Sequence, residues 1–174
     1  MNRHTISVLV ENESGVLTRV AGLFSGRGYN IESLCVAETL DPTVSKMTLV
    51  TSGSDAIIEQ IVKQLNKLVC VIKVVDLTET RYVDRELALI KVNAEEKHRA
   101  EILRIADIFR GKVVDVGSRT FILEVTGDTE KIEAILSLLR PMGIKDIART
   151  GKIALARSHG GIKDKDKDTR EEAA

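Results

Sequence analysis

The chain has 174 residues, of which 43% are hydrophobic and 30% are charged, a composition typical of water-soluble globular proteins. Lysine plus arginine and aspartate plus glutamate number 26 each, so the formal net charge at pH 7 is zero. Proteins that coat nucleic-acid phosphates normally carry a basic excess, so this balance argues against that class of function.

The N-terminal residues predict a cytoplasmic protein. The opening MNRHTISVLVENESG does not resemble a secretory signal, because no apolar segment follows a basic one. No apolar run approaches the roughly 20 residues that cross a bilayer. The two cysteines, Cys35 and Cys70, lie in strand-like runs, and we interpret them as free buried thiols. A disulfide or a metal site is the alternative.

The first half of the chain reads as strand, helix, strand, strand, helix, strand. Apolar residues at helical spacing follow the first strand, and Gly26 and Gly28 end that helix. Asp41-Pro42-Thr43 predicts the turn of an antiparallel hairpin, and Ser54-Asp55 predicts a helix cap. The strands are expected at residues 5–10, 31–39, 46–51 and 69–77, and the helices at residues 14–24 and from residue 54.

The same order returns after a polar connector at residues 78–84. Gly117-Ser118 predicts a tight hairpin turn, and Asp128 predicts a second helix cap. The strands are expected at residues 86–92, 112–116, 120–126 and 144–156, and the helices at residues 96–109 and from residue 128.

A twofold βαββαβ order predicts an α+β protein made of two tandem ferredoxin-like domains. We place the domains at residues 1–78 and 79–158, followed by a disordered polar tail at residues 159–174. Right-handed crossovers place both helices of a unit on one sheet face, with the second and fourth strands at the edges. Exposed edges tend to be paired or covered, so we expect at least a homodimer.

Catalytic and metal-binding patterns are not found in the sequence. The histidines, His4, His98 and His159, do not share a helical face or stand beside a cysteine at ligand spacing. Nucleophile-elbow, P-loop and dinucleotide-binding motifs are missing as well. Aromatic residues make up only 3% of the chain, which disfavours a base-stacking RNA-binding sheet. We therefore predict no catalytic residue and no metal ligand.

The segment Glu11-Asn12-Glu13-Ser14-Gly15-Val16-Leu17-Thr18 carries the one candidate binding site. A glycine in the first helical turn costs roughly 0.5–1 kcal/mol relative to alanine, but it leaves backbone N–H groups open to a ligand carboxylate. Asn12 and Asn30 offer amide groups, and Val16, Leu17 and Ile31 offer apolar walls. The alternative is structural: Asn12 or Ser14 caps the helix, and Gly15 completes a turn.

The segment ENESGVLTRVAGLFSGRGYNIESL, residues 11–34, resembles the start of the ACT domain in small regulatory subunits of acetohydroxyacid (acetolactate) synthase. The resemblance continues through residues 41–50, 64–78, 85–92 and 127–157, and it leaves out the polar tail. It implies an N-terminal ACT domain followed by a C-terminal ferredoxin-like domain of the same family.

The resemblance also implies a function. The partner is a large catalytic subunit that carries thiamine diphosphate, FAD and magnesium and condenses pyruvate with itself or with 2-oxobutyrate. The small subunit has no cofactor of its own, activates that partner and in many members confers feedback inhibition by valine. The effector site at an ACT–ACT interface falls on Asn12, Gly15, Val16, Leu17 and Thr18, with Asn30 and Ile31 opposite.

Two other functions are consistent with the sequence. One is a small free-standing enzyme on the same topology, which would require a convergent set of acid, base or nucleophile residues. The other is an ACT-domain amino-acid sensor that acts alone or on another biosynthetic enzyme.

Overall fold

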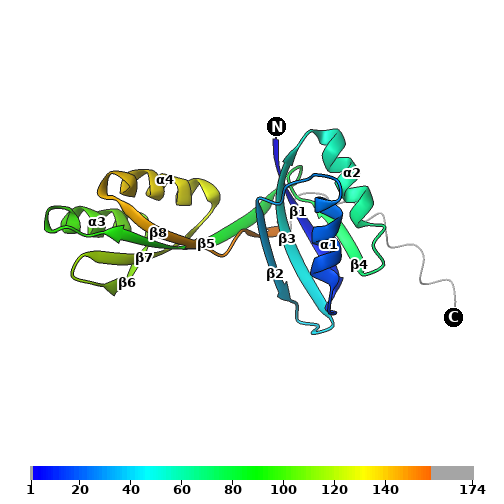
Figure 1. The fold of residues 1–174 in the computed structure, drawn as a ribbon, viewed down its shortest axis with the longest axis horizontal. Coiled ribbons are helices and arrows are strands. Elements are labelled where there is room, and N and C mark those ends of the chain that lie inside the picture. The colour runs from blue at the N-terminus through cyan, green and yellow to red at the C-terminus, as the bar shows by residue number, and fades with distance from the viewer. Residues whose placement is uncertain (1, 158–174) are drawn as a thin grey trace.

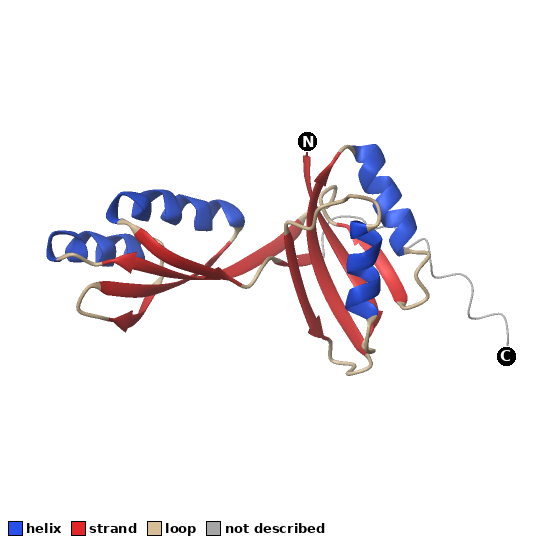
Figure 2. Cartoon of the chain, in the orientation of Figure 1, coloured by secondary structure: helices blue, strands red, loops and turns tan. Residues whose placement is uncertain are grey.

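The computed structural model describes residues 2–157, which form two α+β units joined by one long strand (Figure 1). The predicted disordered tail lies outside the described residues. Two antiparallel sheets, each covered by two helices, confirm the predicted pair of ferredoxin-like domains (Figure 2). Among residues 2–157, no helix is long and apolar enough to cross a membrane.

The first sheet has the strand order β2-β3-β1-β4, so the second and fourth strands lie at its edges as predicted. Alternate residues of β1, Ile6, Val8 and Val10, are fully buried beneath the two helices, which explains the run of β-branched residues there. The elements are β1 Asn2–Glu11, α1 Val16–Ser25, β2 Ser33–Glu38, β3 Val44–Gly53, α2 Asp55–Leu65 and β4 Val71–Asp76.

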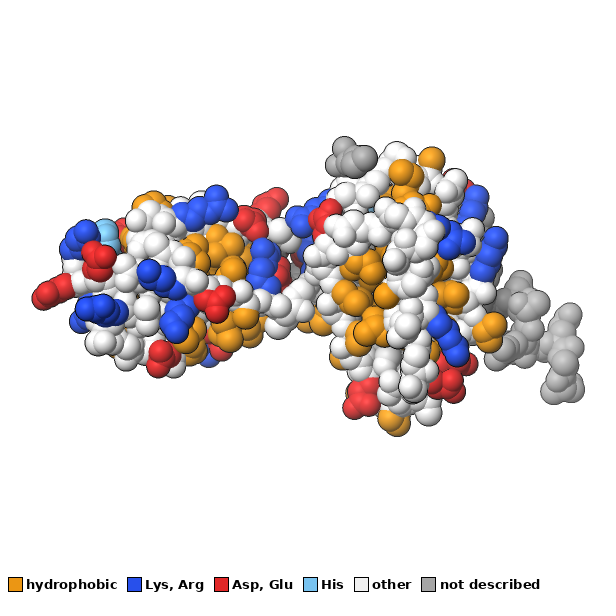
Figure 3. Space-filling view, viewed as in Figure 1, with side chains coloured by type: hydrophobic (Ala, Val, Ile, Leu, Met, Phe, Trp, Pro, Cys, Tyr) orange, Lys and Arg blue, Asp and Glu red, His pale blue; other side chains and the backbone are white. Residues whose placement is uncertain are grey.

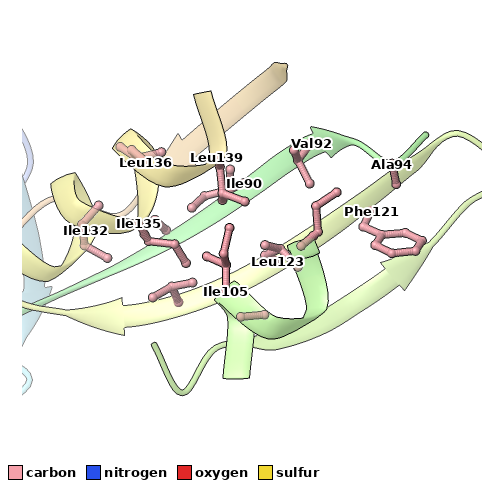
Figure 4. Packing of buried hydrophobic residues seen from close by; sticks show 14 residues of the cluster. Ile90, Val92, Ala94, Ile105, Phe121, Leu123, Ile132, Ile135, Leu136 and Leu139 are labelled. Carbon is pink, nitrogen blue, oxygen red and sulfur yellow. The ribbon is translucent and has the colours of Figure 1, made fainter. Parts of the chain in front are cut away.

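The second sheet has the order β6-β7-β5-β8 and repeats the arrangement of the first. Its core lies between the sheet and one face of each helix, with Ile132, Ile135 and Leu139 of α4 pointing toward the sheet that carries Ile90 and Leu123 (Figure 4). The elements are β5 Tyr82–Asn93, α3 Glu96–Ile108, β6 Lys112–Val116, β7 Thr120–Gly127, α4 Thr129–Leu139, the 3-10 helix η1 Arg140–Met142, β8 Ile144–Arg149 and β9 Ile153–Ala156.

The prediction of a single strand at residues 144–156 is wrong in one respect, because the structure has two strands there, β8 and β9. Both segments run antiparallel to β5, but the pairing register shifts by one residue between Arg149 and Ile153. The intervening Gly151 has φ +82°, a left-handed conformation that favours glycine. One extra residue with a left-handed glycine is a β-bulge, which bends the strand and increases its twist.

Beyond this bulge, residues 82–85 of β5 and all of β9 form a two-stranded ribbon over the helix-free face of the first sheet. The Tyr82 hydroxyl lies 3.5 Å from Thr5 Oγ1, and Ala154 is buried. Beside β2 the ribbon leaves an apolar groove of about 680 Å³. The two cysteines differ, since Cys70 is buried in the core and Cys35 lines that groove.

Candidate functional site

The N-terminal end of α1 presents unpaired backbone N–H groups. Gly15 stands at the N-cap position with φ +84°, so it precedes the helix rather than lying in its first turn as expected. The Val16 amide makes only a long 3.4 Å bond to the Glu13 carbonyl. Within residues 2–157, the amides of Leu17 and Thr18 have no hydrogen-bond acceptor. With no acidic residue in the first turn, this helix end can accept an anion.

Asn12 has a structural task that the sequence did not indicate. No side chain caps α1, so neither Asn12 nor Ser14 acts as the predicted alternative cap. The side-chain nitrogen of Asn12 donates to the Pro42 carbonyl at 2.8 Å, and its side-chain oxygen accepts from the Ser45 hydroxyl at 3.0 Å. These bonds fasten the loop before α1 to the β2–β3 hairpin. One donor and one acceptor lone pair of Asn12 remain for a ligand.

The side chains that follow Gly15 divide between the core and the surface. Val16 is 3% exposed and packs in the core of the first domain, so it does not offer the apolar wall expected of it. Leu17 is 44% exposed and can contact a ligand or a second chain. Thr18 is also exposed.

Asn30 and Ile31 lie at the opposite end of the domain from Gly15. Helix α1 separates the two positions, and its ten residues span about 15 Å. The Asn30 carbonyl accepts a hydrogen bond from Thr51 at the far end of β3, whereas the Gly15 loop follows Glu11, which pairs with Val44 at the near end. One chain therefore does not bring the seven predicted residues together, and a shared site needs the Gly15 end of one chain and the Asn30 end of another.

A second candidate is the charged cleft, an opening of about 280 Å³ between the two domains. Its charged side chains gather at the waist of the molecule (Figure 3). Arg149 binds Glu86 through two nitrogens at 2.5 and 2.8 Å and also reaches Glu133 at 3.0 Å. The hydrogen bonds that Arg149 donates to Glu86, and then to Glu133, raise the pKa of Arg149.

The other charged groups of this cleft are also paired. Arg3 binds Glu32 at 2.5 Å, and Lys152 binds Asp84 at 2.8 Å. The Ser52 hydroxyl and then Arg3 lower the pKa of Glu32. All five charged residues that line the cleft thus have a structural partner. Sequence reasoning missed this cleft because its paired residues are distant in the chain, 29 positions for Arg3 with Glu32 and 63 for Arg149 with Glu86.

Both domains match known families. Residues 6–73 match the ACT domain of the acetohydroxyacid synthase (AHAS) small-subunit type. Residues 85–158 match the family described as the small subunit of acetolactate synthase. Together these two matches span most of the chain.

Individual relatives carry the same description. The acetolactate synthase small subunit of Aquifex aeolicus is 54% identical over 90% of this chain and 82% of its own length. A probable acetolactate synthase small subunit of Archaeoglobus fulgidus is 53% identical over 90% of this chain and 98% of its own. The crystal structure of the acetolactate synthase small subunit from Thermotoga maritima superimposes with a TM-score of 0.81 at 43% identity, covering 90% of this chain and 98% of that one.

Proposed function

This chain belongs to the acetolactate synthase small-subunit family, and from that premise we propose that it is the regulatory subunit of an acetolactate synthase in branched-chain amino-acid biosynthesis. It has no catalytic activity by itself and activates a large catalytic subunit that carries thiamine diphosphate, magnesium and FAD. The observation that carries the proposal is the identity of more than 50% to proteins named small subunits, which extends across both domains.

We further propose that valine is the feedback effector and binds between two ACT domains. Its carboxylate accepts hydrogen bonds from the amides of Leu17 and Thr18, which have no acceptor within the described residues 2–157. Its ammonium meets oxygens near Asn12 and Asn30, and its isopropyl group contacts Leu17 and Ile31.

The magnitudes of these contacts suit a metabolite sensor. A negative charge at a helix N-terminus contributes about 0.3–2 kcal/mol, and burial of an isopropyl group contributes about 1.5–3 kcal/mol. Charge-assisted hydrogen bonds add about 1.5–3 kcal/mol each. After the cost of association, these contributions leave a binding free energy of about 4–8 kcal/mol. This corresponds to a dissociation constant between micromolar and millimolar. Leucine and isoleucine differ from valine by one methylene, about 1–3 kcal/mol, so partial cross-response is expected.

A copurification experiment tests the proposed function. The tagged chain is mixed with an acetolactate synthase large subunit with and without valine, and acetolactate production is measured for each protein alone and for the complex. We expect a stable complex, a higher rate than for the large subunit alone, and inhibition by valine. Acetolactate production by the isolated chain contradicts the non-catalytic role. Valine binding without capture of the large subunit supports a stand-alone sensor instead.

A further inference from the structure

We propose that the β-bulge at residues 150–152 is the joint that connects the effector position to the second domain. The bulge contacts Ser33 and Leu34 of β2, an edge strand of the first sheet. The proposal rests on the proposed function, because it assigns how an effector bound near Asn30 and Ile31 changes the orientation of the C-terminal domain. Four features of the structure support it.

The first feature is the closeness of the contact. The Lys152 amide donates to the Ser33 hydroxyl oxygen at 3.2 Å. A Cβ atom on Gly151 would lie 2.9 Å from Ser33 Oγ and 3.2 Å from the Leu34 carbonyl oxygen. A glycine is therefore favoured at position 151 for two reasons: its φ of +82° is left-handed, and the narrow space between the bulge and β2 leaves no room for a side chain. The second domain here rests directly on the backbone of the first.

The second feature is the place of the bulge in the chain path. On one side of it, β8 pairs with residues 88–92 of β5 inside the second sheet. On the other side, β9 pairs with residues 82–85 and lies over the first sheet. Thr150 fastens the bulge to β5, because its hydroxyl accepts from the Leu87 amide at 3.1 Å. The bulge therefore lies where the chain passes from the second sheet to the ribbon, beside the same passage in β5, so a change in the angle between sheet and ribbon bends the chain here (Figure 1).

The third feature is the charged cleft, whose ion pairs do not connect the two domains. Arg3 and Glu32 both belong to the first domain, and Arg149 binds Glu86 and Glu133 within the second. Lys152 of the bulge binds Asp84 of the ribbon, and both residues belong to the second domain. The cleft can thus widen or narrow without breaking any of these ion pairs, whereas the hydrogen bond from the Lys152 amide to Ser33 does join the two domains.

The fourth feature is the short distance along the chain to the predicted effector residues. Asn30 and Ile31 precede Ser33 by three and two positions. The Glu32 amide donates to the Val50 carbonyl at 2.8 Å, so the start of β2 is fixed in register. A ligand that contacts Ile31 therefore lies two residues from Ser33, which supports the bulge. Regulation of this kind requires a change in affinity of only roughly 5–150-fold between two states.

Three variants test the joint. Gly151→Ala fills the contact and strains the bulge, and Ser33→Ala removes the acceptor for the Lys152 amide while leaving the backbone unchanged. Gly143→Ala is the matched control, because Gly143 has φ +91° and its Cβ would meet only Asn93 of its own domain at 3.6 Å. Each variant is compared with wild type for valine binding by calorimetry and for valine inhibition of the reconstituted complex.

A second measurement does not depend on the catalytic partner. Spin labels at Lys63 on α2 and Lys97 on α3 report the distance between the domains with and without valine, in protein whose two natural cysteines are replaced. The label distance is expected to respond to valine in wild type and in Gly143→Ala, and to lose that response in Gly151→Ala.

The joint and the proposed function fail in different ways. We expect Gly151→Ala and Ser33→Ala to bind valine within about twofold of wild type while the half-inhibitory valine concentration rises at least about tenfold. Unchanged inhibition in both variants, or an equal loss in Gly143→Ala, overturns the joint. If the wild-type chain neither binds valine nor activates the large subunit, the proposed function fails. A label distance that still responds to valine in Gly151→Ala contradicts the joint alone.

Discussion

Gly15 illustrates how a single residue can serve backbone conformation and ligand access together. Its φ of +84° lies in the left-handed region, which costs other L-residues roughly 1–2 kcal/mol. A Cβ built on Gly15 would meet nothing within 4 Å. Crowding within the chain therefore does not explain the glycine, and the open space above it is where a carboxylate would approach the amides of Leu17 and Thr18.

Gly15→Asp is expected to abolish the valine response while the chain still folds. The aspartate carboxylate competes with valine for the N–H groups and repels its carboxylate, so we expect binding to weaken at least about 30-fold, or about 2 kcal/mol. Gly15→Ala is the control, because it adds the backbone strain without the charge. Calorimetry measures the affinity and thermal unfolding measures the strain. Equal valine affinity in the two variants would show that the charge does not meet the ligand.

Glu86 is a buried carboxylate that is paired with Arg149. Its side chain is 7% exposed, and Arg149 meets it with two nitrogens. Removal of one partner of a buried pair costs about 3–5 kcal/mol, and the partial exposure of Arg149 reduces this figure. We expect Arg149→Met to lower the free energy of unfolding by about 2 kcal/mol in urea denaturation. The double variant Arg149→Met with Glu86→Leu should recover most of that loss, and a double variant as unstable as the single one would contradict the account.

At the scale of elements, the two predicted helix caps differ in the structure. Asp128 accepts a hydrogen bond from the Lys131 amide at 2.8 Å at the start of α4, as predicted. Ser54 stands at the N-cap position of α2 but makes no side-chain cap bond. Asp128→Ala should therefore cost about 1 kcal/mol of stability, whereas Ser54→Ala should cost a few tenths at most. Chemical denaturation of the two variants side by side checks this, and equal losses would refute the difference.

The elements that local pattern defines were predictable from the sequence. Residues 112–116 match β6 to the residue, and the antiparallel hairpins at Asp41-Pro42-Thr43 and Gly117-Ser118 form as expected. In each case the periodicity or turn chemistry lies within a few residues, so no distant partner is needed to specify it.

The features that depend on distant partners were not predictable. The break between β8 and β9 follows from pairing with two different stretches of β5 and from the close approach of Gly151 to β2, 118 positions earlier. The sequence predicts Asn12 as a ligand residue or a helix cap, but its side chain bonds to Pro42 and Ser45 of the β2–β3 hairpin. The candidate site is likewise divided between the two ends of α1, because this ten-residue helix separates Gly15 from Asn30 and Ile31.

At the scale of the whole molecule, the predicted site requires two copies of the chain. In a symmetric dimer the Gly15 end of each chain would meet the Asn30 end of the other, which gives two equivalent sites. Valine that binds between the chains would stabilise the dimer by mass action. Sedimentation at micromolar concentration should therefore show a dimer whose dissociation is reduced by valine, and a stable lone monomer would contradict this arrangement.

Mixing two defective variants tests whether the site is shared between chains. Gly15→Asp alters one half of the site, and Asn30→Ala alters the other while keeping the backbone carbonyl that accepts from Thr51. Each variant alone should bind little valine at a concentration that saturates wild type. After subunit exchange, half of the dimers are mixed, and each of these has one intact site and one site with both changes, so about a quarter of the wild-type sites should return. Differently tagged chains confirm the exchange by copurification. If exchange occurs and no binding returns, the two groups do not meet across the interface. The carboxylate then binds at Gly15 without Asn30, or it binds elsewhere.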